Sequence, residues 1–339
     1  MKAGIIGWPG SGRDAIFSSL TGLSRPPFGS ADARQGEALV PDDRLDKLTA
    51  MFQPKKHTPA RLEFFLPHPV GLPKEALKAS LEKVRETEVI LLVLRNFAQE
   101  GEAAPNPAKE IADLESELIV SDYLVVEKRL ERMAEEVKRG KKNDPEELEL
   151  LEKAKAELES NRPLRLDPIY SRSPKLRGFA FLSAKPLLAV INNADDDDKT
   201  VELNGPWPKV VVRGRLEEEL AQMEPEDAAE FLSDYQLTEP AAARVIREVY
   251  HLMGLISFFT VGEDECRAWT IQAGETALDA AGAIHSDIQK GFIRAEVVSY
   301  EDFSAAGGMN EAKKKGSFRL EGKTYVVTDG DIVHFRFNV

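Results

Sequence analysis

Short apolar runs recur along the first two thirds of the chain, separated by segments in which apolar residues follow a helical spacing. Such runs are typical of strands in a parallel sheet, which carry apolar side chains on both faces. A helix is expected over 13–21, where Gly22 provides a stop, and another over 74–86. The predicted strands cover 2–6, 61–66, 89–94, 187–191 and 209–212. This alternation predicts an α/β fold with a mostly parallel sheet.

A longer amphipathic pattern, over 108–160, interrupts the alternation. Its apolar residues recur at spacings of four and three, the rhythm of a helix–helix seam: Ile119, Tyr123, Val126, Leu130, Met133 and Val137. After a break at 139–143, Asp144 and Pro145 provide a helix cap and a first-turn proline. The return helix would carry Leu148, Leu151, Ala154 and Leu158. We therefore expect an inserted antiparallel helical hairpin, or short coiled coil, whose seam is satisfied within one chain, so that the protein is a monomer.

The pattern changes again at the C-terminal end. The predicted strands are 267–271, 293–299, 325–327 and 332–337, and the predicted helix is 276–285. Several strands and one helix in so short a segment predict a small α+β domain. The Pro- and Arg-rich stretch 163–178 is expected to be a connector. The predicted boundaries are 1–107 with 166–254 for the α/β domain, 108–165 for the hairpin and 255–339 for the C-terminal domain.

Composition narrows the class of protein. The 339 residues suggest two or three domains, and a hydrophobic fraction of 42% allows a sizeable core. The net charge of −13 argues against broad electrostatic capture of nucleic acid, which leaves only local basic patches for that role. Cys266 is the single cysteine and is expected to be an ordinary packed thiol. Without a disulfide, a secretory signal or an apolar run of about 18 residues, a cytoplasmic protein with no membrane span is expected.

The most informative motif follows the first predicted strand. Residues 7–14 read Gly-Trp-Pro-Gly-Ser-Gly-Arg-Asp, which has the glycine spacing of a phosphate-binding P-loop. Such a loop directs backbone N–H groups at an anion in front of a helix N-terminus. The candidate phosphate-binding residues are Gly7, Pro9, Gly10, Ser11, Gly12, Arg13 and Asp14.

Two residues of this loop depart from P-loop chemistry. Arg13 stands where the pattern has Lys, so a planar guanidinium replaces a compact ammonium. Asp14 stands where the pattern has Ser or Thr. A carboxylate ~5 Å from a phosphate charge costs roughly 3 kcal/mol at an effective dielectric of ~20. Asp14 could instead satisfy the helix N-terminus itself, or hold Mg²⁺ against a nucleotide, and the sequence leaves both roles open.

Several further stretches carry a family resemblance. They are Asp43-Arg44-Leu45-Asp46-Lys47-Leu48, Arg85-Glu86-Thr87-Glu88, Arg267-Ala268-Trp269-Thr270-Ile271, Lys290-Gly291-Phe292-Ile293-Arg294-Ala295, Tyr300-Glu301-Asp302-Phe303 and Asp329-Gly330-Asp331. Over nearly its whole length the chain resembles the YchF subfamily of Obg-type P-loop GTPases. The resemblance implies a G domain interrupted by a helical hairpin, and a C-terminal TGS domain of β-grasp fold. It also implies binding of purine nucleotide, commonly ATP rather than GTP, with Mg²⁺, slow hydrolysis and association with ribosomes.

This sequence departs from that family in several of the motifs that surround the nucleotide. The family's DxxG element corresponds to His68-Pro69-Val70-Gly71, which has no carboxylate, and the following switch looks shortened because 73–84 contains no glycine. Ser30 is the best match for the switch I threonine. The last base-contacting loop is replaced by Arg213-Gly214-Arg215, which could hold an anion or pair with the acidic residues 217–219.

The base-recognition element of the family corresponds to Asn192-Asn193-Ala194-Asp195. Asn192 and Asp195 keep the spacing that could read a purine edge, although an acidic turn at 195–198 could also be merely solvated. A basic cluster at the predicted hairpin tip could contact RNA phosphate or be a solvated turn: Lys138, Arg139, Lys141 and Lys142. The C-terminal aromatic residues are expected in the core rather than on a base-stacking surface: Trp269, Phe292, Phe303, Phe335 and Phe337.

We interpret the sequence as a YchF-like protein whose hydrolytic motifs have decayed and which acts as a scaffold on the ribosome or RNA. No residue is assigned a catalytic role. Two alternatives stay open at this point. One is a nucleotide-binding switch with weak ATPase or GTPase activity that uses Arg13 and Asp14. The other is a protein-interaction module without a ribosomal role.

Overall fold

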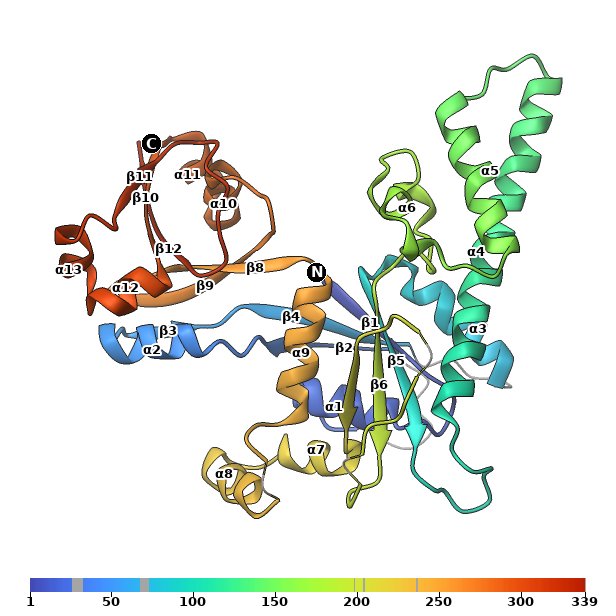
Figure 1. Ribbon diagram of the computed structural model, residues 1–339, viewed down its shortest axis with the longest axis horizontal. Coiled ribbons are helices and arrows are strands. Elements are labelled where there is room, and N and C mark those ends of the chain that lie inside the picture. The colour runs from blue at the N-terminus through green and yellow to red at the C-terminus, as the bar shows by residue number, and fades with distance from the viewer. Residues whose placement is uncertain (26–32, 68–72, 198, 204, 236, 339) are drawn as a thin grey trace. The chain divides into compact units, whose positions relative to one another are not determined.

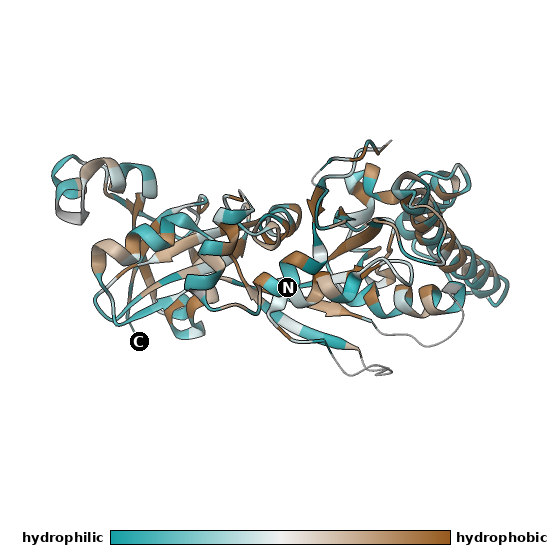
Figure 2. Ribbon diagram, turned by 90° about the horizontal axis from the view of Figure 1, so that it is seen from below, coloured by the Kyte–Doolittle hydropathy of each residue, from teal (hydrophilic) through white to brown (hydrophobic). Residues whose placement is uncertain are grey.

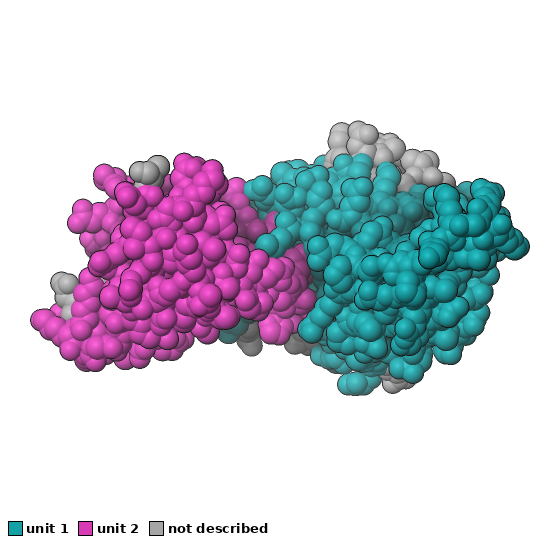
Figure 3. Space-filling model, turned by 90° about the horizontal axis from the view of Figure 1, so that it is seen from above, with its two compact units in different colours: residues 1–38, 63–245 teal, residues 39–62, 246–339 magenta. Residues whose placement is uncertain are grey.

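The structure, a computed structural model, describes residues 1–25, 33–67, 73–197, 199–203, 205–235 and 237–338. The chain divides into two compact units, each made of two segments (Figure 3). Unit 1 comprises Met1–Ala38 and Glu63–Val245. Unit 2 comprises Leu39–Leu62 and Ile246–Val339.

Unit 1 is built on a six-stranded sheet in the order β2-β4-β1-β5-β6-β7 (Figure 1). Strand β1 pairs in parallel with β4 and β5, and β6 pairs in parallel with β5 and β7. The strands are β1 (Lys2–Ile6), β2 (Arg34–Leu39), β4 (Arg61–Leu66), β5 (Val89–Asn96), β6 (Leu187–Asn193) and β7 (Lys209–Val212). Every residue of β6 and all but the last of β5 are buried, as expected at the centre of a parallel sheet. The predicted α/β fold is therefore confirmed.

Helices of unit 1 cover this sheet and extend from it. Figure 2 shows the hydrophobic residues gathered on the strands. Leu77 of α3 and Ile111, Leu114 and Leu118 of α4 pack with the apolar side chains of β5 and β6. The helices are α1 (Arg13–Thr21), α3 (Pro73–Lys83), α4 (Pro107–Lys138), α5 (Pro145–Glu159), α6 (Pro168–Arg172), α7 (Gly214–Leu220), α8 (Pro225–Asp234) and α9 (Ala241–Leu252), the last with residues in both units. Among the described helices, none combines the length and apolar character that a membrane crossing needs.

The long helix α4 turns back into α5 as a helical hairpin (Figure 1). Asp144 caps α5 through hydrogen bonds from the backbone N–H groups of Glu146 and Glu147, as its sequence predicts. The seam of the hairpin consists of apolar side chains from both helices: Ile119, Val126, Met133, Leu151, Ala154 and Leu158. Val137 is 54% exposed, so the predicted seam ends one helical repeat earlier, because α4 outlasts the partner helix that could cover it.

The predicted connector 163–178 is more ordered than its composition indicates. It contains two short 3₁₀ turns, Leu164–Leu166 and Arg177–Phe179, on either side of α6. Leu164 and Tyr170 are buried against the base of the hairpin. The segment is therefore packed and is not a free linker.

Unit 2 contains a second six-stranded sheet, in the order β11-β10-β12-β8-β9-β3. Its strands are β3 (Lys56–Thr58), β8 (Leu255–Thr260), β9 (Glu265–Gln272), β10 (Phe292–Ser299), β11 (Arg319–Glu321) and β12 (Asp331–Phe337). Its helices are α2 (Asp43–Phe52), α10 (Ala277–Ile284), α11 (Ser286–Lys290), α12 (Tyr300–Ala306) and α13 (Met309–Lys314). The segment 39–62 thus contributes α2 and β3 to the unit that holds the C-terminal domain.

Two expectations for the C-terminal segment are wrong. Residues 325–327 do not form a strand but a single antiparallel bridge between Val326 and Thr276. The bridge cannot extend because a turn closed by the Tyr325 N–H and the Gly322 carbonyl precedes it. Phe337 is 43% exposed and lies outside the core, although Phe292, Phe303 and Phe335 are buried. Cys266 is fully buried in β9, and this burial raises the pKa of its thiol.

Candidate functional site

The loop of residues 7–12 joins the carboxyl end of β1 to the start of α1. The carboxyl ends of the parallel strands β5 and β6 lie at the same edge of the sheet, where α/β folds place their ligand sites. Gly10 and Gly12 have φ angles of 82° and 84°, a left-handed conformation that favours glycine. The Ser11 N–H donates to the Trp8 carbonyl at 3.1 Å, which closes a tight turn. The loop therefore has the backbone shape on which an anion cradle depends.

Asn192, near the end of β6, fixes this loop from the side. Its Nδ2 donates to the Ser11 carbonyl at 2.9 Å, and its Oδ1 accepts from the Gly214 N–H at 2.8 Å. The side chain is 4% exposed, and a Cβ on Gly12 would lie 2.2 Å from Nδ2. Asn192 thus ties the loop to the first residue of α7. This bracing contact was not foreseen, although a polar residue inside an apolar strand was a signal for it.

Asp195 follows β6 and is engaged by both arginines of the Arg213-Gly214-Arg215 run. Arg215 Nη2 lies 2.6 Å from its carboxylate, and Arg213 Nη1 donates to its carbonyl at 3.4 Å. Arg215 also lies 4.0 Å from Glu219, which is the pairing that the sequence offered as an alternative to anion binding. Arg215 is 75% exposed, so these contacts stabilise the turn only weakly. The predicted base-binding roles of Asn192 and Asp195 stay predictions.

Arg13 folds back onto its own loop. Its Nη1 donates to the Gly7 carbonyl at 3.3 Å. Burial lowers the pKa of the Arg13 guanidinium, while the neighbouring Asp14 charge opposes that shift. In the P-loop pattern the residue at this position is a lysine that reaches the outer phosphates.

Arg34, at the start of β2, is a second cation near Asp14 that no sequence motif marked. Its guanidinium stacks 4.3 Å from the Phe17 ring centre and donates to the carbonyls of Leu23 and Ser24. Burial lowers the pKa of Arg34, and the negative charge of Asp14 is the largest influence that opposes this shift. The Asp14 carboxylate therefore lies in the field of two arginines, Arg13 and Arg34.

Ser11 presents an unusual polar atom inside the loop. Its side chain is 1% exposed, and its Oγ has no hydrogen-bond partner among the described residues. A buried hydroxyl without a partner costs about 1–3 kcal/mol. Such a cost is typical of a functional site, where geometry is kept at the expense of stability.

Comparison with known proteins adds the decisive observation. The chain is 37% identical to "Ribosome-binding ATPase YchF" of Bacillus subtilis (strain 168), over the full length of both proteins. It is 36% identical to the protein of the same name from Escherichia coli O157:H7, covering 100% of this chain and 99% of that one. The chain belongs to the YchF family.

Other matches agree with this YchF assignment. The family model described as "YchF-GTPase_C: Protein of unknown function (DUF933)" matches residues 255–338. "Obg-like ATPase 1" of Oryza sativa subsp. japonica is 32% identical and is covered over 92% of its length. The "Structure of the Schizosaccharomyces pombe YchF GTPase" superposes with a TM-score of 0.79 at 27% identity, covering 99% of this chain and 97% of that chain. The resemblance inferred from the sequence is therefore confirmed.

Two predicted departures of this YchF chain fall outside the described residues. They are Ser30, the match for the switch I threonine, and His68-Pro69-Val70-Gly71, the match for DxxG. The basic cluster, by contrast, is described. Lys138 ends α4, and Arg139, Lys141 and Lys142 lie exposed in the turn that leads to α5. Arg139 pairs with Glu135 at 3.4 Å. Its side chain is 74% exposed, so the guanidinium stays accessible to a partner.

Proposed function

We propose that this YchF protein has lost productive nucleotide hydrolysis and acts as a scaffold associated with the ribosome or RNA. The observation that carries the proposal is the position of Arg13. Its guanidinium is engaged with the Gly7 carbonyl instead of extending from the loop as a phosphate-binding lysine would. Phosphoryl transfer depends on positioning and on charge neutralisation by metal and lysine. A loop whose cation is directed inward provides neither the positioning nor the charge neutralisation that a triphosphate needs.

The charges around Asp14 support the same proposal. Magnesium in P-loop proteins is held by a Ser or Thr hydroxyl at this position and by the nucleotide phosphates. Here the position carries a carboxylate in the field of Arg13 and Arg34. Two nearby positive charges oppose the entry of a divalent cation at this carboxylate, and the Asp14 charge offsets part of the attraction of the two arginines for phosphate. The residues present therefore fit a magnesium–nucleotide complex poorly, and we derive no hydrolytic step through it.

A ribosomal or RNA role is supported by the relatives and by the hairpin tip. The proteins from Bacillus subtilis and Escherichia coli O157:H7 are both named as ribosome-binding. The tip cluster of Lys138, Arg139, Lys141 and Lys142 offers positive charge on a chain whose net charge is −13. Such a local cluster can contact phosphate while the rest of the surface repels nucleic acid.

Steady-state hydrolysis tests the first half of the proposal. We expect ATP and GTP turnover at background level with Mg²⁺, unchanged in Arg13→Ala. Turnover that depends on Mg²⁺ and is abolished by Arg13→Ala would overturn it. The same preparations should retain native circular dichroism, because Arg13 makes only one long hydrogen bond to its loop.

Co-sedimentation with ribosomes over a salt series tests the second half. We expect Lys141→Ala/Lys142→Ala to weaken binding and to flatten its dependence on salt, since each phosphate contact adds to that dependence. Lys153→Ala is the matched control, because Lys153 lies exposed on α5 and pairs with Glu149 at 2.7 Å. Binding that is absent at low salt would instead favour an interaction module without a ribosomal role.

Three observations favour a second candidate function, a nucleotide-binding switch with weak activity. The loop backbone is intact, Asn192 braces it, and Ser11 Oγ has no partner among the described residues. In this candidate Arg13 would contact phosphate and Asp14 the metal. Calorimetry with ATP, GTP and their diphosphates separates the two candidates. Metal-dependent binding with a dissociation constant of about 1 μM would favour the switch, and binding weaker than about 1 mM would favour the scaffold.

A further inference from the structure

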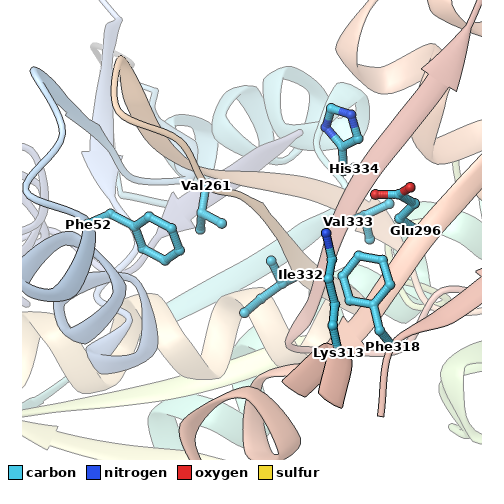
Figure 4. Close-up of a pocket in the computed structure, with 8 residues that line it drawn as sticks. All are labelled: Phe52, Val261, Glu296, Lys313, Phe318, Ile332, Val333 and His334. Atoms are coloured by element: carbon cyan, nitrogen blue, oxygen red, sulfur yellow. The ribbon is translucent and has the colours of Figure 1, made fainter. Parts of the chain in front are cut away.

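Unit 2 contains a pocket that the proposed function does not use (Figure 4). Its volume of about 330 Å³ is at the small end of the range for ligand sites. The residues that line it come from α2, the turn between β8 and β9, β10, α13, the segment between α13 and β11, and β12. Those that matter for its chemistry are Phe52, Val261, Ile332, Phe318, Lys313 and Glu296. All of them are well separated in sequence from the P-loop.

One part of the pocket is apolar and held in place. Phe52 ends α2 and stacks against the buried Phe303 ring, with centroids 5.8 Å apart. Ile332 of β12 and Val261 add aliphatic surface (Figure 4). Phe318 supplies a second aromatic ring across the pocket from Phe52 (Figure 4). The space between the rings suits an aromatic or branched aliphatic group, because such surfaces exclude water from both sides of it.

The polar part of the pocket carries the Lys313 ammonium, one neutralised carboxylate and the exposed His334 side chain (Figure 4). Lys313 Nζ lies 4.8 Å from the centre of the Phe318 ring, and no ion pair within the described part of the chain includes it. Glu296 is only 7% exposed and forms an ion pair with Arg336 on the neighbouring strand β12. A positive charge on Lys313 therefore remains for a ligand. The Glu296 carboxylate stays available as a hydrogen-bond acceptor.

We propose that this pocket binds a carboxylate attached to a bulky apolar group, as in an apolar α-amino acid or the last residue of a polypeptide. The carboxylate pairs with Lys313, and the apolar group fills the space between Phe52 and Phe318. A ligand N–H donates to Glu296. A positively charged ligand would lack the pairing with Lys313, and a purely apolar ligand would leave that ammonium desolvated without a partner. This proposal does not depend on whether the P-loop binds or hydrolyses nucleotide.

Methyl NMR on the full chain, labelled at isoleucine and valine methyl groups, tests the proposal directly. The probes are N-acetyl-L-phenylalanine and N-acetyl-L-phenylalaninamide, which differ only in the carboxylate. We expect the acid to shift the methyl resonances of Ile332 and Val261 through its ring current and to saturate. The amide should bind at least about tenfold more weakly, because it carries no negative charge and cannot form an ion pair with Lys313. Equal binding of the two probes, or no shift of these methyl groups at about 5 mM, would overturn the proposal.

A pair of lysine variants makes the test specific to the pocket. Lys313→Met removes the cation and keeps the length of the stem, and we expect about a tenfold loss of affinity for the acid probe. Lys314→Met removes the same charge from the next residue, which is exposed and does not line the pocket. Its affinity should stay within about twofold of the parent. Equal losses in the two variants would show a general charge effect and contradict the assignment.

The same titration distinguishes the two sources of the ligand. Free L-phenylalanine and a short peptide that ends in phenylalanine share the carboxylate and the ring. Tighter binding of the amino acid identifies a small-molecule site, since its ammonium can contact Glu296. Tighter binding of the peptide identifies capture of a polypeptide end. The amide of the same peptide, which lacks the free carboxylate, should bind more weakly than the peptide itself.

Discussion

Two polar sites of unit 1 have opposite character. Asp122 of α4 is fully buried and accepts hydrogen bonds from Leu182 N–H at 2.9 Å, Ser183 N–H at 2.6 Å and Arg85 Nη1 at 3.2 Å. We call these four residues the Asp122 site. In the P-loop, Ser11 Oγ is equally buried and has no partner among the described residues. The Asp122 carboxylate is fully hydrogen-bonded within the protein, whereas the Ser11 hydroxyl is left without a partner among the described residues.

The contrast indicates which property of the P-loop has changed. The Asp122 site holds the base of the hairpin without any ligand, because each of its donors already has an acceptor. The P-loop keeps the glycines, the turn and the Asn192 brace that shape an anion site. Only the charged side chains differ, since Arg13 is turned inward and Asp14 adds a negative charge. Our proposal is therefore that the loop has lost its cation and metal chemistry and retained its architecture.

The largest effect that we predict is at the Asp122 site. Asp122→Ala leaves two buried N–H groups without an acceptor and removes an ion-pair partner from Arg85. We expect a loss of about 3–5 kcal/mol in the free energy of unfolding. Urea unfolding followed by circular dichroism measures it.

Two variants sharpen this first prediction. Asp122→Asn keeps one acceptor oxygen and should lose less, about 1–3 kcal/mol. Asp113→Ala, on the exposed face of the same helix, should stay within about 0.5 kcal/mol of the parent. A loss for Asp122→Ala no greater than for Asp113→Ala would remove the distinction between the two polar sites.

Much of unit 1 could be predicted because its signals are local. Buried parallel strands are continuous apolar runs, and β1, β4 and β7 have the predicted bounds. The hairpin follows from a regular apolar spacing and from the Asp144–Pro145 helix start. The seam was overextended to Val137 because spacing shows which face is apolar and not where the partner helix ends.

The features that sequence reasoning missed depend on contacts between distant residues. Strand β3 has three residues and no apolar run, and only its parallel pairing with β9 defines it. Arg34 reaches the neighbourhood of Asp14 through the fold alone, with no motif around it. Asn192 was predicted to contact a base, and its contacts with Ser11 and Gly214 depend on how three segments meet.

The second prediction alters the P-loop side of the comparison. Arg13→Lys/Asp14→Ser restores the P-loop pattern and removes a carboxylate that costs roughly 3 kcal/mol against a nearby phosphate charge. We expect magnesium–ATP to bind tenfold to about a hundredfold more tightly, with hydrolysis still at background. Calorimetry and a turnover assay on the same preparation measure both properties.

The single variants separate the two contributions. Asp14→Ser should recover most of the affinity, because it removes the repulsion, and Arg13→Lys alone should recover less. No gain in the double variant would show that the architecture of the loop, and not only its charge, has changed. Recovered hydrolysis would show that the departures at Ser30 and His68 matter less than we infer.

The smallest predicted effect concerns a buried carboxylate in unit 1, Glu217 of α7. Burial raises the pKa of its carboxyl, against hydrogen bonds from the Ala241 and Ala242 N–H groups. A raised pKa in the folded state means that the folded state binds the proton more tightly. Its contribution to stability is full below the unfolded pKa of about 4.3 and is lost as the pH rises through the folded pKa.

Glu217→Gln cannot ionise, so the parent should lose stability relative to this variant as the pH rises from about 4 toward neutrality. Urea unfolding of both proteins over this pH range measures the difference. Glu226→Gln, at an exposed position of α8, controls for the removal of one acidic charge. A difference that does not change with pH would mean that the hydrogen bonds from α9 offset the effect of burial on the pKa. Glu217 would then differ from Asp122, because burial raises the pKa of the Asp122 carboxyl despite its hydrogen bonds from Leu182 and Ser183.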